Sequence, residues 1–445
     1  MAHGEGIDYS VRFSSSEDRP LVYCGRIGVS ALRFRDDVQR LVADLPKDGD
    51  ILIHCDGRYA FSVALLAAWM SDRAAILPPN RLKEDLEVIR SNNTVAFECD
   101  SSWEHRLMRS VSAEQGEHGE WRVNLPGDRH GMNLYTSGST GSPKLVPKTI
   151  GNLLSEAKVL FQTFEWSDAP IVATVHPHHQ YGLTFSLLLP WIGGFPWVDE
   201  TPLYPQDILT LVQSTGAGTL ISVPPQYKAM LSDKTRLPQV RCVSAAAPLA
   251  PEVAAAWLVH QSTEILEIYG CTEGGVIAYR TQVSGPGWRV FDEVTISTSD
   301  GLLVVASPFV SHAYGAEFQT ADRIQQSGDG GFELLGRSDS IIKIGGKRVS
   351  LDGISQQLMA CEGVLDAVAI AHDVNGLVRD KVIWAAVAVG EDAELDSRQL
   401  RRFLQGRLDS IEMPKRLVFV KELPRTANGK LPREKLAGLF DGYGE

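Results

Sequence analysis

The segment from Tyr135 to Lys144 reads YTSGSTGSPK and holds the residues of this chain that are best suited to binding a polyphosphate. Glycine lets the backbone turn sharply and brings N–H groups close to an anion, while hydroxyl groups donate hydrogen bonds and Lys144 adds a positive charge. The segment is not a Walker loop, because Leu145 follows the lysine where that motif has Ser or Thr. A flexible Gly/Ser turn is the alternative interpretation, but a lysine at this offset favours phosphate binding. The expected phosphate ligands are Thr136, Ser137, Gly138, Ser139, Thr140, Gly141 and Lys144.

A second polar group, YGCTEGG at residues 269–275, follows the apolar run ILEIY. Ligands of open α/β sheets bind at the carboxyl ends of the strands, so this position suits a nucleotide. Tyr269 could stack on a base, Gly270 would expose the backbone and Thr272 could donate to a phosphate. Glu273 offers a carboxylate of the kind that holds Mg²⁺. The residues alone leave open a plain strand-to-loop turn with an exposed glutamate.

The segment FQTADR, residues 318–323, brings an acidic residue that could bind a sugar. Asp322 could accept two hydrogen bonds from ribose hydroxyl groups, and Arg337 could add a second contact. A surface pair of aspartate and arginine is the alternative.

The composition is that of a globular protein with more than one domain. A chain of 445 residues exceeds what one hydrophobic core normally holds, so two or three domains are expected. Hydrophobic residues make up 44% and charged residues 22%, which excludes a disordered chain. The net charge of −12 argues against a nucleic-acid partner and against binding to an anionic membrane surface.

Cysteine spacing and apolar segments predict a cytoplasmic protein without membrane insertion. The six cysteines show no CxxC spacing, which indicates reduced thiols rather than disulfides or a zinc site. The first residues, MAHGEGIDYSVRF, lack the apolar core of a signal peptide. The most apolar stretch, residues 184–198, is interrupted by prolines and glycines and is too short to span a bilayer.

The order of apolar segments predicts an α/β fold with a large N-terminal domain of mixed and parallel sheets with flanking helices. A strand at 51–55, a helix at 60–70 and a strand at 75–77 have the spacing of a parallel sheet with crossover helices. Further strands are expected at 171–175, 219–223, 241–244 and 264–269, with helices at 206–213 and 251–259. Short strands with glycine turns follow from residue 289, and a compact α+β unit closes the chain. The predicted domains are residues 1–337 and 338–445.

Together these motifs resemble the signature of the adenylate-forming enzymes, which include acyl-CoA and aryl-CoA synthetases, nonribosomal adenylation domains and luciferases. The resemblance extends from about residue 50 to about residue 440, with its motifs in the family's order. It implies that ATP and Mg²⁺ bind between the phosphate segment and the YGCTE turn, with Glu273 as the metal ligand. It also implies that Thr272 contacts the α-phosphate and that Ala246 and Ala247, in the turn SAAAP, lie alongside adenine and the acid.

The resemblance assigns the small domain a mobile, catalytic role. The segment PRTANGK ends in Lys430, which in the family reaches the substrate carboxylate and the α-phosphate. A lysine between two anions offsets their repulsion and stabilises charge in the transition state, although a solvated lysine is the reading that the residue alone would favour. Asp339 matches the family's hinge. The segment at 343–348 matches a loop that lines the passage for the thiol.

The segment from His176 to Gly182 concerns the acid. Three histidines invite a metal interpretation, but no carboxylate or cysteine at ligand spacing accompanies them. The resemblance instead implies that His179 walls the acid pocket near the reacting carboxylate. Adenylation domains for amino acids usually carry an aspartate in this region and this chain has none, which favours an acid without an amino group.

The predicted function is an ATP-dependent acid–thiol ligase. It would convert a small carboxylic acid to an acyl-adenylate with release of pyrophosphate, and then transfer the acyl group to the pantetheine of CoA or of an acyl carrier protein with release of AMP. An aryl or short acid is favoured because Tyr181, Trp191 and Trp197 lie near the expected pocket, although core packing explains these aromatic residues equally well. One alternative is a ligase that loads only a carrier protein. Another is a catalytically silent nucleotide-binding regulator, suggested by Ala321 and Gly353, where the family usually has glycine and glutamate.

Overall fold

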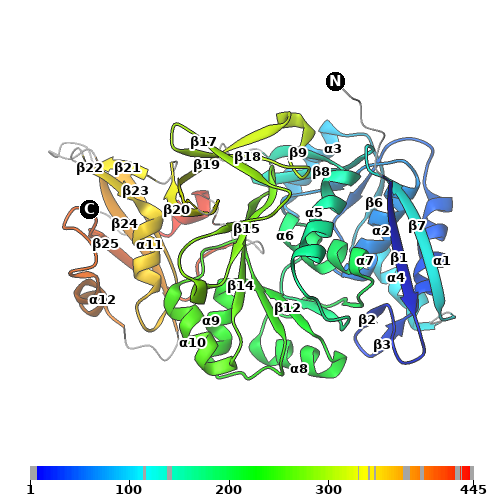
Figure 1. Ribbon diagram of the computed structural model, residues 1–445, viewed down its shortest axis with the longest axis horizontal. Helices are drawn as coiled ribbons and strands as arrows, with labels where there is room; N and C mark the ends of the chain where they lie inside the picture. Colours follow the sequence, from blue (N-terminus) through cyan, green and yellow to red (C-terminus); the bar gives the residue numbers. More distant parts are fainter. Residues whose placement is uncertain are drawn as a thin grey trace.

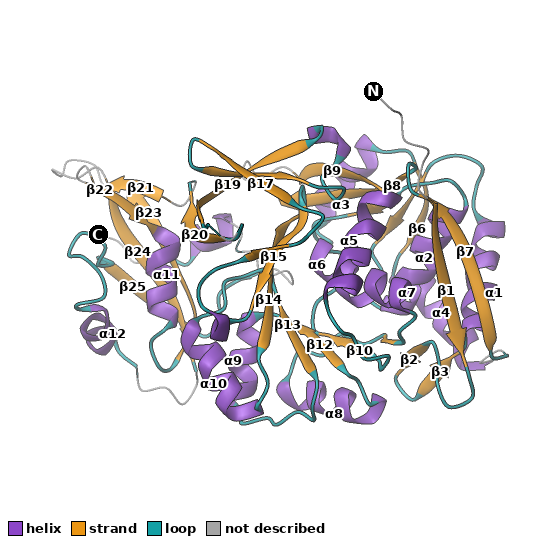
Figure 2. Ribbon diagram, in the orientation of Figure 1, coloured by secondary structure: helices purple, strands orange, loops and turns teal. Residues whose placement is uncertain are grey.

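The structure, a computed structural model, describes residues 8–113, 117–137, 143–328, 330–338, 341–344, 347–373, 381–390, 395–425, 431 and 433–440. These residues form several mixed sheets with flanking helices (Figures 1 and 2), which confirms the predicted α/β class. The C-terminal elements gather at the end of the molecule opposite to the first strand (Figure 1). In the described part of the chain, no helix is both long enough and apolar enough to cross a membrane.

A five-stranded sheet carries the phosphate segment. Its order is β6 (Val95–Cys99), β4 (Asp50–Ile53), β5 (Ala75–Leu77), β8 (His130–Ser137) and β9 (Pro143–Thr149). The first four strands are parallel to their neighbours, and β9 is antiparallel to β8. Helix α2 (Arg58–Met70) connects β4 with β5, and almost all of its residues are buried. The predicted strand–helix–strand unit is therefore present.

A nine-stranded sheet carries the YGCTE segment. Its order is β16 (Arg289–Val290), β15 (Gly275–Arg280), β14 (Ile265–Cys271), β13 (Arg241–Ser244), β12 (Thr219–Ser222), β10 (Ile171–Ala173), β11 (Trp197–Val198), β2 (Val22–Cys24) and β3 (Ile27–Val29). The strands from β14 to β2 are parallel, and those at both edges are antiparallel. Helices α8 (Pro205–Thr215), α9 (Pro224–Ser232) and α10 (Pro251–Gln261) connect the parallel strands. The carboxyl ends of the parallel strands β12, β13 and β14 therefore lie at one edge of the sheet, and the YGCTE segment stands at the carboxyl end of β14, as predicted.

Helix α5 (Ile150–Thr163) lies between these two sheets. It begins directly after β9 with a capping box, in which Thr149 Oγ1 accepts from Asn152 N and Asn152 Oδ1 accepts from Thr149 N, both at 3.0 Å. Leu153 on this helix belongs to the core that contains β4 and α2, whereas Leu160 belongs to the core that contains β10 and β12. The helix thus fixes the strand that carries Lys144 against both sheets.

Smaller elements complete this part of the chain. Strands β17 (Thr295–Ser299), β18 (Leu302–Ala306), β19 (Glu317–Gln326) and β20 (Phe332–Arg337) form an antiparallel sheet, and β1 (Asp8–Ser15) pairs with β7 (Gly119–Pro126). The other helices are α1 (Ala31–Asp44), α3 (Lys83–Asn92), α4 (Ser101–Ala113), α6 (Gln180–Leu183) and α7 (Leu189–Gly193), with a π-helical turn at Thr184–Leu188. The change to short strands that was predicted from residue 289 is therefore present.

The C-terminal elements have cores of their own. They are β21 (Ile341–Ile344), β22 (Lys347–Ser350), α11 (Leu351–Met359), β23 (Val364–Asp373), β24 (Lys381–Val389), α12 (Ser397–Leu404), β25 (Arg416–Val420) and α13 (Arg433–Gly438). Strand β24 lies between antiparallel β23 and parallel β25. Buried residues of this sheet form two hydrophobic clusters with α11, α12 and α13. The division into domains at residue 337 and the mobility of the small domain stay predictions.

Candidate active site

Lys144 and Glu273 join the two segments that were predicted to bind phosphate. Lys144 extends from β9, and Glu273 lies in the turn between β14 and β15. The Nζ atom of Lys144 lies 2.9 Å from Oε1 of Glu273. The lysine side chain is 48% exposed and the glutamate 17% exposed, so the pair lies at the surface where the two large sheets meet. A ligand that approaches this point would meet both charges.

The surroundings keep Lys144 positively charged. Burial lowers the pKa of Lys144, but hydrogen bonds with Tyr314 and Glu273 outweigh it, and the pKa is raised. The Nζ atom lies 5.3 Å from the centre of the Tyr314 ring. A partly exposed ion pair of this kind contributes about 1 kcal/mol or less to stability. At small cost in free energy, phosphate oxygens could therefore replace Glu273 as the partner of Lys144, and a cation could replace Lys144 as the partner of Glu273.

Tyr269, Asp322 and Arg337 form a second cluster beside the first. The hydroxyl group of Tyr269 donates to Asp322 Oδ2 at 2.6 Å, and Arg337 Nη1 lies 3.4 Å from Asp322 Oδ1. Asp322 on β19 is the direct partner of Arg337 on β20 in the ladder. Burial and the Asp322 carboxylate raise the pKa of Tyr269, so its hydroxyl group stays protonated. The sequence predicted this aspartate and this arginine, but not their link to the tyrosine.

Glycines make the turn between β14 and β15 tight. A Cβ atom on Gly270 would lie 2.4 Å from the carbonyl oxygen of Gly275. Gly275 itself has a φ of +76°, and a Cβ there would lie 2.5 Å from Phe309 Cβ. The close backbone approach leaves Thr272 and Glu273 at the tip of the turn, and both are partly exposed.

The turn after β13 presents Ala246 and Ala247 to solvent. Ala246 has a φ of +69°, a left-handed conformation that costs a residue with a Cβ about 1 kcal/mol. Its exposed methyl group stands where glycine would be favoured on backbone grounds. The sequence predicted that these alanines lie at the site, and whether they contact a ligand stays a prediction.

The predicted acid segment lies at the start of α6. His179 is the N-cap residue of this helix and is partly exposed. Tyr181 is partly buried, and its hydroxyl group donates to the carbonyl oxygens of Ser222 at 2.9 Å and Val243 at 3.0 Å. This hydroxyl group therefore holds the ends of β12 and β13.

Trp191 and Trp197 belong to the core rather than to an open surface. They are 1% and 0% exposed and pack in the cluster that contains α2. Of the two explanations that the sequence left open, core packing therefore holds for these two rings, and they give no information about the size of the acid.

Several predicted residues cannot be placed. Gly138, Ser139, Thr140, Gly141, Asp339 and Lys430 lie outside the described residues. Of Ser137 only the backbone is described, and it pairs with Pro143 at the end of β8. Thr136 Oγ1 donates to the Lys144 carbonyl oxygen at 3.4 Å. The meeting of the phosphate loop with Lys430 stays a prediction.

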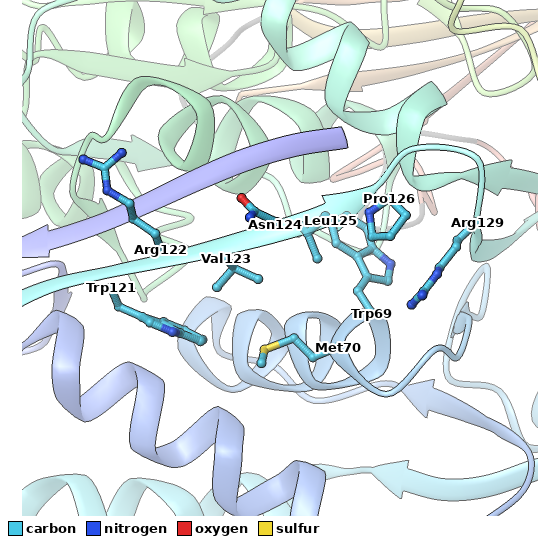
Figure 3. A pocket seen from close by; sticks show the side chains of 9 residues that line it. All are labelled: Trp69, Met70, Trp121, Arg122, Val123, Asn124, Leu125, Pro126 and Arg129. Atoms are coloured by element: carbon cyan, nitrogen blue, oxygen red, sulfur yellow. The ribbon is translucent and has the colours of Figure 1, made fainter. Parts of the chain in front are cut away.

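A hollow elsewhere on the surface contains none of the predicted residues. It has a volume of about 340 Å³ and lies between α2 and β7 (Figure 3). Its lining consists of Trp69, Met70, Trp121, Arg122, Val123, Asn124, Leu125, Pro126 and Arg129. Since it lies away from the Lys144–Glu273 pair in the fold, it is not part of the candidate site.

Sequence reasoning missed two buried ionisable side chains beneath the site. Lys148 on β9 is fully buried, and its Nζ atom donates to the carbonyl oxygens of Glu273, at 3.0 Å, and Phe309. Glu156 on α5 is 1% exposed, and its carboxylate accepts a hydrogen bond from Gln180 Nε2. Burial raises the pKa of Glu156 to about 7, opposed by the charge of Lys148 and by hydrogen bonds. A signal was present, because Glu156 interrupts the apolar face of its helix.

Two family models match this chain: one described as AMP-binding enzyme, over residues 40–301, and one described as AMP-binding enzyme C-terminal domain, over residues 354–430. The chain belongs to the family of AMP-binding enzymes. The first match covers more than half of the chain and includes both residues of the Lys144–Glu273 pair. The predicted resemblance to adenylate-forming enzymes is confirmed, and so is the reaction type, an ATP-dependent acid–thiol ligase that forms AMP.

Individual relatives of this AMP-binding enzyme are distant. It is 29% identical over 309 residues to a 4-coumarate–CoA ligase of Halorhodospira halophila, a match that covers 68% of this chain and 75% of the relative. It is 25% identical over 496 residues to a mitochondrial malonate–CoA ligase of Bos taurus, covering 87% and 82%. The fold is similar to that of an anthranilate CoA ligase in complex with anthranoyl-AMP, with a TM-score of 0.78, 17% identity and coverage of 96% and 94%. At that identity the structural likeness shows the fold alone.

Proposed function

We propose that this enzyme brings ATP and a carboxylic acid together where Lys144 and Glu273 meet, and then transfers the acyl group to a pantetheine thiol. The observation that carries this proposal is the 2.9 Å contact between Lys144 Nζ and Glu273 Oε1. These residues are 129 positions apart in sequence, and each belongs to a motif suited to a phosphate. Because the two motifs meet at one partly exposed point, a single phosphate-containing ligand would contact both of them.

The reaction needs two steps because a carboxylate is a poor electrophile. A carboxylate oxygen attacks the α-phosphorus of ATP, the bond to the bridging oxygen of pyrophosphate breaks, and an acyl-adenylate forms. The sulfur of the thiolate then attacks the acyl carbon, and AMP leaves with the bonding electrons. The thiol proton passes to solvent.

The phosphate side of the site would be held by positive charges and hydroxyl groups. Lys144 would exchange its contact with Glu273 for the β- and γ-phosphates, together with Ser137, Thr140 and the glycines of their loop. Thr272 at the tip of the turn would donate to the α-phosphate. Lys430 would stabilise charge where the carboxylate meets the α-phosphate, which requires the C-terminal part to approach by rotation about Asp339.

The residues present fit a Mg²⁺ ion that arrives with the triphosphate. Mg²⁺ prefers oxygen ligands and is usually held by one or two carboxylates together with substrate phosphates. Glu273 supplies one carboxylate that is partly exposed and already paired with a cation. When bound, the metal would neutralise charge on the phosphates. The chain's own part would be to keep the Glu273 carboxylate aimed at that point.

The nucleoside side would be held by the cluster around Tyr269. Asp322 and Arg337 are paired on neighbouring strands and their side chains lie 3.4 Å apart, so both would contact the ribose hydroxyl groups of one nucleoside. The Tyr269 ring would stack on adenine, with Gly270, Ala246 and Ala247 along its edge.

The acid would bind near His179, and we propose an aryl or short acid without an amino group. Support comes from the named substrates of the relatives, which are 4-coumarate and malonate, and from the absence of an aspartate in the segment 176–182. We propose CoA as acceptor because both of these relatives are named CoA ligases. Phosphopantetheine on a carrier protein offers the same thiol.

A pyrophosphate-release screen tests the function. The full-length protein would be supplied with ATP, Mg²⁺ and one acid at a time from aryl, short, dicarboxylic and long-chain sets. Release that depends on an aryl or short acid, followed by AMP formation on addition of CoA, is the expected result. Release without transfer to CoA, but with transfer to a phosphopantetheinylated carrier protein, would assign the enzyme to carrier loading. ATP binding without release for any acid would identify a silent regulator.

A further inference from the structure

Two lysines of strand β9 bind Glu273, one at its side chain and one at its backbone. Residues 144, 146 and 148 lie on one face of this strand, because side chains alternate along a strand. Lys144 contacts the carboxylate of Glu273 at 2.9 Å, and Lys148 donates to the backbone carbonyl oxygen of the same residue at 3.0 Å. The first lysine is half-exposed, whereas the second is completely buried. One strand therefore fixes both the side chain and the backbone of the predicted metal ligand.

Around the buried Lys148 side chain, hydrogen bonds connect strand β9, the Glu273 turn and the segment 309–311. Lys148 Nζ also donates to the carbonyl oxygen of Phe309. Ser311, which is fully buried, donates from its backbone N–H to the Glu273 carbonyl oxygen at 2.9 Å and from its hydroxyl group to the carbonyl oxygen of Pro147 on β9. The strand, the Glu273 turn and the segment 309–311 are thus tied to one another.

An ammonium group at this depth is costly unless its surroundings compensate it. Burial of an unpaired charge costs several kcal/mol, and a well-packed apolar side chain would usually fill such a space at lower cost. Lys148 is compensated by its hydrogen bonds to two backbone carbonyl oxygens, those of Glu273 and Phe309. One of these acceptors is the backbone of Glu273, the residue whose carboxylate contacts Lys144. Hydrophobic packing alone does not explain why a lysine at position 148 binds this residue.

We propose that Lys148 is a positioning residue that holds the Glu273 turn where its carboxylate can serve the Mg²⁺–triphosphate. This inference rests on the proposed function and deepens it. Lys148 does not reach the substrate, since its side chain is buried beneath the turn. Its effect is therefore exerted on the step that involves the β- and γ-phosphates. Attack of a thiol on an acyl-adenylate involves neither, and it should not depend on Lys148.

The test compares Lys148→Met with Lys158→Met in the full-length protein. Methionine nearly matches lysine in length and lacks the charge, and Lys158 is exposed on α5. Acid-dependent ATP–pyrophosphate exchange measures adenylate formation at varied Mg²⁺, and thioester formation is measured from CoA and a supplied acyl-adenylate of the acid that the screen identifies. Misplacement of a group by about 1 Å costs roughly 100-fold in rate, so we expect about that loss in adenylate formation for Lys148→Met. The Mg²⁺ concentration for half-maximal exchange should rise by about 10-fold, the lower end for loss of a residue that orients a metal ligand.

Thiol attack on the supplied adenylate should stay close to the wild-type rate, and Lys158→Met should behave as wild type in both assays. Equal loss in both half-reactions would assign Lys148 a structural role and overturn the inference, as would unchanged exchange. If Lys148→Met does not fold, Ser311→Ala decides: it removes only a hydroxyl group of the same network, and a selective loss of about 10-fold in exchange is expected. A wild type that releases no pyrophosphate with any acid would instead overturn the proposed function.

Discussion

The buried carboxyl group of Glu156 should make the stability of this enzyme depend on pH in the neutral range. The side chain lies between the two large sheets, where its carboxyl group accepts a hydrogen bond from the Gln180 side chain. Burial raises its pKa from 4.5 to about 7, even though the charge of Lys148 opposes the shift. The protonated form is therefore favoured in the folded protein well above the pH at which a free glutamate ionises.

The sign follows from the two protonation states. Below pH 4.5 the group is protonated in both the folded and the unfolded chain, and its contribution to stability is fully present. Between pH 4.5 and about 7 the unfolded chain loses the proton first, so rising pH favours unfolding. At about 1.4 kcal/mol per pH unit, this interval removes about 3 kcal/mol from the free energy of unfolding by pH 8.

Glu156→Gln isolates this contribution, because the amide cannot ionise. The variant should carry a constant cost of about 1–3 kcal/mol, since the amide NH₂ group cannot accept the hydrogen bonds that a carboxylate oxygen accepts. Urea unfolding of both proteins from pH 5 to pH 8 gives the difference in unfolding free energy at each pH. Relative to wild type, the variant should gain about 3 kcal/mol over this range. Glu252→Gln, at an exposed position on α10, is the control and should follow the wild-type pH dependence.

Parallel pH curves for wild type and Glu156→Gln would refute the reasoning. They would mean that Glu156 is already ionised in the folded protein at pH 5. The attraction of Lys148 would then outweigh burial, and the two side chains would form a charged pair.

Three further predictions concern the site. Lys430→Ala should reduce pyrophosphate exchange by about 100-fold or more, the scale of a lost transition-state charge, and leave thiol attack on a supplied acyl-adenylate nearly intact; equal losses would show that the lysine is misassigned. Glu273→Gln should also reduce exchange by about 100-fold. Its unfolding free energy should change by about 1 kcal/mol or less, because the ion pair with Lys144 is partly exposed. Tyr181→Phe should lower the unfolding free energy by about 1–2 kcal/mol, through the lost hydrogen bonds to Ser222 and Val243, and should keep the acid preference. A changed preference in the acid screen would place that hydroxyl group in the acid pocket.

Local patterning predicted most of the elements that carry the site. The apolar runs at 51–55 and 75–77 with a helix between them correspond to β4, α2 and β5, and the runs at 241–244 and 264–269 correspond to β13 and β14. Such segments can be predicted from sequence because a strand that is buried on both faces requires a continuous run of apolar residues. The chemistry of the motifs could also be predicted, because contacts with phosphates and sugars need particular residue types at close spacing in the sequence.

Contacts between residues far apart in the sequence could not be predicted in this way. The sequence grouped Lys144 and Glu273 with one ligand, but it could not show that they touch. The sequence analysis did not single out Lys148, which is buried beneath the Glu273 turn. For Trp191 and Trp197 the sequence left a pocket and the core open as alternatives, and the structure places both residues in the core.

The sequence by itself determined the family, the reaction type and the residue types that serve it, because these depend on short motifs whose chemistry is local. The tertiary structure decided which charges meet. It brought β9 beside the turn after β14, so that one lysine contacts the carboxylate of Glu273 and another its backbone. That arrangement depends on how two sheets pack around α5, and the packing of residues far apart in the chain is not encoded in any single segment.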